Sequence, residues 1–217
     1  VAAALAAAGP LAAQGALSLQ GFGYPAGQLS TRAAGTAGAL AEGDAGSPLN
    51  PASLHSTGRS IFSFQVEPEF REVKVGGTVV NTTTVRFPVI IIGSRLGNNG
   101  FVGVSFSTLL DHTWDATYSD TVTVADERVR SFVSSSVRGA VNDARLAFAW
   151  RFADRLQAGL ALHAITGASH VQIARAFTDS SVFGALLQKS VLGYSGGALS
   201  AGIVATPVAN LSVAASM

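Results

Sequence analysis

Residues 144–166 decide the fold expected for this chain: Ala144-Arg-Leu-Ala-Phe-Ala-Trp-Arg-Phe152, then Ala153-Asp-Arg155, then Leu156-Gln-Ala-Gly-Leu-Ala-Leu-His-Ala-Ile-Thr166. In the first part, large apolar side chains stand at every second position, with Ala and Arg between them. The last part alternates in the same way, with Gln, Gly, Ala and His between the apolar residues. Because successive side chains of a strand point to opposite faces, the stretch predicts two strands joined by a short turn.

The same alternation recurs along most of the chain. From position 58, one predicted face carries Phe62, Phe64, Val66, Pro68 and Phe70, and the other carries Ser63, Gln65, Glu67, Glu69 and Arg71. Further strands are expected at 84–93, 101–110, 191–205 and from 211 onward. The segments 111–142 and 167–190 are polar and are expected to be long connections, with two short strand extensions possible within 111–142. Short turns that alternate with long connections are typical of outer-membrane barrels.

The composition narrows the class of protein. Charged residues make up only 12% of the 217 residues, about half of the ~25% usual in a soluble domain. The net charge of +1 disfavours a nucleic-acid-binding protein. There is no Cys, and the four His residues have no spacing typical of metal ligands. We therefore expect no nucleic-acid partner, no metal and no cofactor.

These patterns predict an all-β fold: a transmembrane antiparallel β-barrel of about seven strands within residues 58–217, incomplete because such barrels use an even number. The chain has no apolar run long enough for a membrane-spanning helix beyond its N-terminus. A soluble β-sandwich or jelly roll is the alternative, since it also alternates and is divided by turns.

The N-terminus is expected to belong to an export signal. Residues 1–15 are apolar and Ala-rich and are interpreted as the remnant of a signal peptide. A buried Ala-rich helix is the alternative. No initiator Met precedes Val1, and the strand count is odd, so we expect the sequence to be part of a longer reading frame.

Residues 16–57 lack strand alternation and are rich in small residues, which favours a segment packed inside another structure. Residues 30–44 are expected to hold a short helix. In Ser47-Pro-Leu-Asn-Pro-Ala-Ser-Leu54, two Pro residues predict a compact turn rather than a regular element.

Residues 32–41, Asp44 and residues 47–54 together resemble the N-terminal hatch of the long-chain fatty acid transporter family (FadL-like outer-membrane proteins). That family has a Gly-rich stretch, an acidic residue and an Asn-Pro-Ala motif before its first strand. Trp150–His163 is similar to its strand–turn–strand hairpin. The resemblance implies a larger barrel plugged by residues 16–57, with passage of hydrophobic molecules through it.

The expected function is passive transport of long-chain fatty acids or other hydrophobic compounds, such as hydrocarbons, across the bacterial outer membrane. Asn50, Pro51 and Ala52 are expected to form the plug motif. The candidate lumen-facing or ligand-facing residues are Arg32, Glu67, Glu69, Arg71, Arg86 and His163. Arg32 or Arg71 could pair with a carboxylate headgroup, whereas an ion pair with Glu67 or Glu69 is the structural alternative for Arg71.

The sequence disfavours an enzyme and leaves one alternative function open. The sequence has no Gly-x-Ser-x-Gly motif, and no third member of a Ser–His–acid triad is apparent, so an enzyme is not expected. A structural outer-membrane barrel that anchors or scaffolds a secretion or surface partner is the alternative function. In both cases the outer-membrane lipid bilayer is the expected partner.

Overall fold

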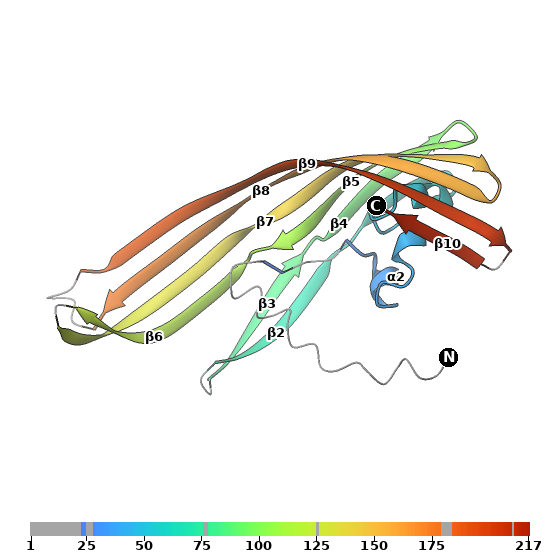
Figure 1. Cartoon of the computed structure of the whole chain (residues 1–217). Coiled ribbons are helices and arrows are strands. Elements are labelled where there is room, and N and C mark those ends of the chain that lie inside the picture. Colours follow the sequence, from blue (N-terminus) through green and yellow to red (C-terminus); the bar gives the residue numbers. More distant parts are fainter. Residues whose placement is uncertain (1–22, 25–27, 76–77, 125, 179–183, 210) are drawn as a thin grey trace. The chain divides into compact units, whose positions relative to one another are not determined.

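A computed structural model describes residues 23–24, 28–75, 78–124, 126–178, 184–209 and 211–217 (Figure 1). These residues form mostly antiparallel strands, which confirms the all-β class. The expected signal segment, 1–15, lies outside the described residues, as do the first residues of the expected plug.

The described residues include ten strands, with bounds β1 Ser60–Phe64, β2 Glu67–Val75, β3 Thr78–Arg86, β4 Val89–Leu96, β5 Gly100–Asp111, β6 Trp114–Val124, β7 Glu127–Ala153, β8 Leu156–Phe177, β9 Leu186–Val208 and β10 Leu211–Ser216. The main sheet has the order β1-β4-β5-β7-β8-β9-β10, with β6 paired to β7, and β2 and β3 form a separate hairpin. Among the described residues the sheet is open, with β1 and β10 at its ends.

The chain divides into two compact units. Unit 1 contains Leu110–Val141 and Gly167–Tyr194 together with the residues up to Pro25. Unit 2 contains Ala26–Leu109, Asn142–Thr166 and Ser195–Met217. Strands β5, β7, β8 and β9 each contribute residues to both units.

The first expected strands are each interrupted. Residues 58–75 form β1 and β2, and residues 78–96 form β3 and β4, with a break before Val89. Pro88 is fully buried at this break and has no N–H to donate to a ladder. Pro68 is tolerated within β2 because that strand has only one partner, β3. The expected faces are nevertheless confirmed: from Phe62 to Phe70 the apolar side chains are exposed and those between them are half-buried.

The two expected long connections were wrong. Residues 114–124 form β6, and β7 begins at Glu127; likewise β8 runs to Phe177 and β9 begins at Leu186. Their polar composition, which includes many Ser and Thr residues, favoured connections over strands. Thr is in fact a good strand former, and the β6–β7 pairing is regular from Trp114 to Val137.

The segment before the strands contains short helices. Helix α2, Thr31–Ala34, is capped by the Ser30 hydroxyl, which accepts from the Ala33 N–H at 3.0 Å. A 3-10 turn follows at Ala41–Gly43, and Pro51–Thr57 forms a longer 3-10 helix. The expected irregular turn at 47–54 is therefore partly helical. Asn50 caps this helix, and Pro51 suits its first position because that position needs no N–H.

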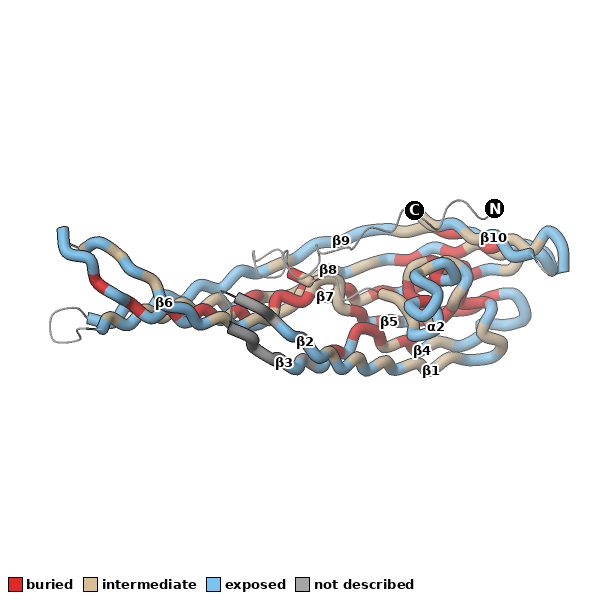
Figure 2. Tube along the Cα trace, turned by 90° about the horizontal axis from the view of Figure 1, so that it is seen from below, coloured by how far each residue is buried: buried red, intermediate tan, exposed pale blue. Residues whose placement is uncertain are grey.

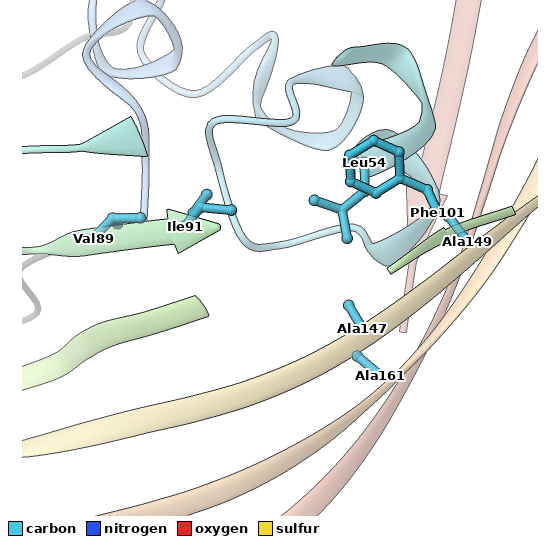
Figure 3. Packing of buried hydrophobic residues seen from close by; sticks show 7 residues of the cluster. All are labelled: Leu54, Val89, Ile91, Phe101, Ala147, Ala149 and Ala161. Atoms are coloured by element: carbon cyan, nitrogen blue, oxygen red, sulfur yellow. The ribbon is translucent and has the colours of Figure 1, made fainter. Parts of the chain in front are cut away.

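Unit 2 has an apolar cluster between the 3-10 helix and the sheet (Figure 3). Leu54 projects from the helix toward Phe101 of β5, and Ala147, Ala149 and Ala161 line the neighbouring strands. Small side chains on β7 and β8 leave space for the helix to approach the sheet. Burying Leu54 contributes roughly 2 kcal/mol. In the part of the chain that the structure describes, no helix combines the length and the apolar character needed to cross a membrane.

Candidate functional site

In unit 2 the sheet has one covered face and one exposed face (Figure 2). The covered face packs against residues 28–57. Beside the buried apolar residues Val89, Ile91 and Phe101, it holds small and polar residues: Gly103, Ser105, Ser107, Asp143, Arg145, Ala147, Ala149, Gly159, Ala161, His163, Ser200, Gly202 and Val204. The apolar face holds large exposed residues: Val102, Val104, Phe106, Leu146, Phe148, Trp150, Leu160, Leu162, Leu199 and Ile203. The sheet of a water-soluble protein buries its apolar face. In unit 2 the large apolar residues are on the exposed face instead, and we call this arrangement inverted polarity.

Asn50 connects the 3-10 helix to the sheet. Its side-chain amide donates to the carbonyl oxygens of Ile203 and Ala215 at 3.1 and 3.3 Å. Its side-chain oxygen accepts from the Ala52 N–H at 2.9 Å. Pro51 and Ala52 are buried beside it. The Asn-Pro-Ala motif therefore caps a helix and fixes that helix to β9 and β10.

Asp44 holds the preceding loop together. Its carboxylate accepts hydrogen bonds from the hydroxyls of Ser30 and Ser47 and from the Gly46 N–H. The Ser47 hydroxyl in turn accepts from the Ser30 N–H at 2.9 Å. One acidic side chain thus fixes the loop between α2 and the Asn-Pro-Ala motif.

Arg145 is a buried cation on the covered face that the sequence analysis did not single out. The residue is only 3% exposed, and one guanidinium nitrogen donates to the Pro48 carbonyl. Its Nε and Nη2 atoms are buried and have no hydrogen-bond partner among the described residues. A small cavity of about 10 Å³ lies beside it, lined also by Ser47, Asn50 and Ser105. The N–H groups of such a guanidinium can donate hydrogen bonds to a carboxylate.

His163 lies in a row with two other polar side chains. Its Nδ1 is 2.8 Å from Asp143 Oδ2, and its Nε2 is 2.8 Å from Ser200 Oγ. The expectation that no third residue is placed beside a Ser–His pair was therefore wrong. Asp143 also accepts from the Gln28 side chain at 3.4 Å, which links the row to the N-terminal segment.

This row resembles a catalytic triad in its atoms, but the backbone amide next to Ser200 is not free to stabilise an oxyanion. An oxyanion must be stabilised by preorganised N–H donors. The N–H of Ala201, which follows Ser200, already donates to the Met217 carbonyl at 3.0 Å. The arrangement fits a polar network that spans β7, β8 and β9.

The remaining candidate residues do not converge. Glu69 pairs with the buried Arg86, a contact between β2 and β3. Glu67 is half-buried, and Arg32 is exposed on α2. The side chain of Arg71 lies outside the described part of the chain. The structure thus joins Glu69 to Arg86, whereas the alternative in the sequence analysis was a pair with Arg71.

His55 is buried in the 3-10 helix, and its environment disfavours a charge. Burial lowers the pKa of its imidazole, and the nearby cations Arg151 and Arg95 lower it further. Its Nε2 has no hydrogen-bond partner among the described residues. The packing of this helix therefore favours the neutral ring.

The apolar face is grooved. One groove of about 580 Å³ is lined by Phe148, Trp150, Leu160, Ile203 and Met217. The rings of Phe148 and Trp150 are stacked with centroids 6.0 Å apart. A second groove of about 620 Å³ lies along Leu146, Leu162 and Leu199. Both grooves have the size and apolar lining suited to acyl chains.

Comparison with protein-family profiles, curated proteins and solved structures finds no match for this chain. Within the described residues, no group of three or more His, Cys, Asp or Glu side chains is placed to hold a metal ion. The assignment of the candidate site therefore depends on the geometry of the described residues.

Proposed function

We propose that this chain belongs to a bacterial outer-membrane β-barrel, in which residues 28–57 act as a plug, and that the barrel passes long-chain fatty acids or related hydrophobic molecules. The energy for this movement is the substrate's own concentration gradient. The lipid bilayer is the environment of the apolar face.

The inverted polarity of unit 2 carries the proposal. Ten large apolar side chains on the apolar face are 36% to 77% exposed. Leaving them in water forfeits roughly 10 kcal/mol of hydrophobic free energy. Acyl chains covering this face recover that energy, and the grooves beside Trp150 and Leu199 accommodate them. The low content of charged residues and the resemblance of residues 32–54 to the FadL-like hatch support the same assignment.

Arg145 is the residue that we assign to a carboxylate headgroup. Its two unpartnered donors face the covered side of the sheet, where a charge is costly unless it is paired. The cavity beside it holds one water molecule at most. A ligand thus reaches Arg145 only when the loop at Pro48 moves, so headgroup binding is coupled to displacement of the plug.

Uptake by whole cells tests the function. We expect cells that carry the protein to take up radiolabelled oleate faster than cells that lack it. Arg145→Met is expected to reduce oleate uptake about tenfold at low concentration, because a charge-assisted contact is lost. Uptake of hexadecane, which has no carboxylate, is expected to be unchanged.

Arg155→Met is the matched control, because Arg155 lies exposed in a turn and donates to the Pro207 carbonyl. Heat-modifiable gel migration checks that each variant is folded. Equal oleate uptake with and without the protein would contradict the transport function. If secretion or surface display of another protein is lost instead, the anchoring function is correct.

That second function is favoured by one observation. In unit 1, strands β6 and β7 pair regularly over eleven positions and expose mainly hydroxyl and Arg side chains. A regular polar sheet of this kind offers a surface to a partner protein.

A further inference from the structure

The exposed side chains of β7 change character along the strand. In unit 2 the exposed even-numbered residues are Leu146, Phe148, Trp150 and Phe152, and in unit 1 they are Arg128, Arg130 and Arg138 together with Phe132 and Ser134. Buried odd-numbered positions continue from Val129 to Ala149, interrupted only at Gly139. The alternation therefore persists while the exposed residues change from apolar to cationic.

The pairing of β6 with β7 defines this exposed face, which we call the arginine face. Thr123 pairs with Arg128, Thr121 with Arg130, Ser119 with Phe132, Thr117 with Ser134, and Asp115 with Ser136. Paired residues of an antiparallel ladder share a face of the sheet. The arginine face thus surrounds its cations with hydroxyl groups, and Asp115 is the acidic residue on it in the described part of the hairpin.

The charges of the arginine face are available for a ligand. Among the described residues, Arg128 and Arg130 have no carboxylate at ion-pair distance, and Arg130 lies 5.8 Å from the Phe132 ring centroid. Arg138 pairs with Asp115 at 2.7 Å, but both side chains are more than half exposed. Exposed ion pairs of this kind contribute little free energy. Arg138 can therefore leave Asp115 and pair with an anion of higher charge.

Apart from Asp115, the described carboxylates of the hairpin do not neutralise this face. Asp120 lies on the opposite face, where Arg175 and Ser131 surround it. Glu127 pairs with Val124 at the end of the ladder, also at a position of the opposite parity. Asp126 lies in the turn. Arg130 and Arg138 are thus separated from the acidic end of the hairpin.

We propose that the arginine face binds the phosphate groups of anionic lipid headgroups, with Arg128, Arg130 and Arg138 pairing with phosphate oxygens and the Ser and Thr hydroxyls donating beside them. This proposal rests on the membrane location proposed above. Guanidinium groups bind phosphate through two parallel hydrogen bonds. Phe132 suits the same environment, because aromatic side chains gather at the membrane–water interface.

Binding to defined lipids tests this proposal. The purified protein in neutral detergent is titrated with diphosphoryl lipid A and with the same lipid lacking its phosphates. We expect only the phosphorylated lipid to bind, and we expect its binding to weaken as salt concentration rises. Replacing Arg128, Arg130 and Arg138 by Ser is expected to weaken binding roughly fivefold for each residue removed.

Arg95→Ser is the control, because Arg95 is an exposed strand residue of unit 2. An R128K/R130K/R138K variant keeps the charge but loses the planar donors, and is expected to bind with intermediate affinity. Equal binding by the wild-type and Ser variants would overturn the proposal. It would also be overturned if inorganic phosphate competed as strongly as the lipid, because the face would then be a general anion site.

Oleate uptake separates this proposal from the transport function. We expect the Ser variants to retain uptake while losing binding to phosphorylated lipid. If the wild-type protein takes up no oleate but still selects the phosphorylated lipid, the transport function fails and the lipid site stands.

Discussion

Gly159 of β8 lies directly beneath Ala52 of the 3-10 helix. A Cβ atom at position 159 would stand 2.5 Å from the Ala52 amide nitrogen and 2.6 Å from the Pro51 carbonyl carbon. Both atoms belong to the backbone and cannot rotate away. Gly159 therefore sets how closely the Asn-Pro-Ala segment approaches the sheet.

Gly159→Val is expected to displace the 3-10 helix without disrupting β8. Overpacking of this kind costs about 1–3 kcal/mol, and Val is itself favourable in a strand. Hydrogen–deuterium exchange should be faster over residues 50–57 and unchanged along β8. Gly193→Val on β9 is the control, since a Cβ there meets no atom within 4 Å. Unchanged exchange over residues 50–57 would show that the close approach is unimportant.

Asn50→Ala is expected to loosen the plug while the sheet persists. The substitution removes the helix cap and both bonds to β9 and β10, at about 1 kcal/mol for each bond. Oleate uptake should change, whereas heat-modifiable migration should not. Asn50→Ser keeps a capping oxygen but is too short to reach both carbonyls, and is expected to be intermediate. Loss of heat-modifiable migration in Asn50→Ala would instead assign the motif to folding.

The packing of the 3-10 helix should depend on pH through His55. Because burial lowers the pKa of His55 below its ordinary value of 6.5, the ring is neutral in both the packed and displaced states above that value. As the pH falls below 6.5, the displaced state binds the proton first, so the packed state loses stability until the lowered pKa is reached.

Exchange over residues 50–57 should therefore accelerate as the pH falls below 6.5, after correction for the intrinsic pH dependence of exchange. His55→Gln should remove this extra acceleration. An identical pH profile in the two proteins would exclude His55 as its source.

The Asp143–His163–Ser200 row is expected to behave as one network. Asp143→Ala should destabilise the fold by about 1–3 kcal/mol, because the half-buried imidazole of His163 loses its partner. In a double-mutant cycle with His163→Ala, the two effects should be strongly non-additive. Urea titration of the refolded protein measures both quantities. Additive effects would mean that the 2.8 Å contact between Asp143 and His163 contributes no coupling energy.

The alternation of side chains along residues 144–166 predicted part of the candidate site. Positions 147, 149 and 151 were placed on one face, and continuing that parity by four residues reaches Arg145 and Asp143. Asp143 was missed because the expected strand starts at position 144, whereas Arg145 lies within that strand and was not singled out from the pattern alone. Ser200 could not be identified in this way, since the partner of His163 depends on the register between β8 and β9, and register depends on pairing across the sheet.

Sequence by itself determined the strand class and the inverted faces, because a period of two assigns each side chain to a face without reference to any neighbour. The conformation of Asn50-Pro51 was partly determined in the same way, since Pro restricts its own backbone and that of the preceding residue. Only the tertiary structure decided which strands pair, that β6 and β7 extend the sheet, and that Asn50, Arg145 and His163 find partners far along the chain. Those contacts join residues about 20 to 165 positions apart, and no local pattern encodes which distant residues meet.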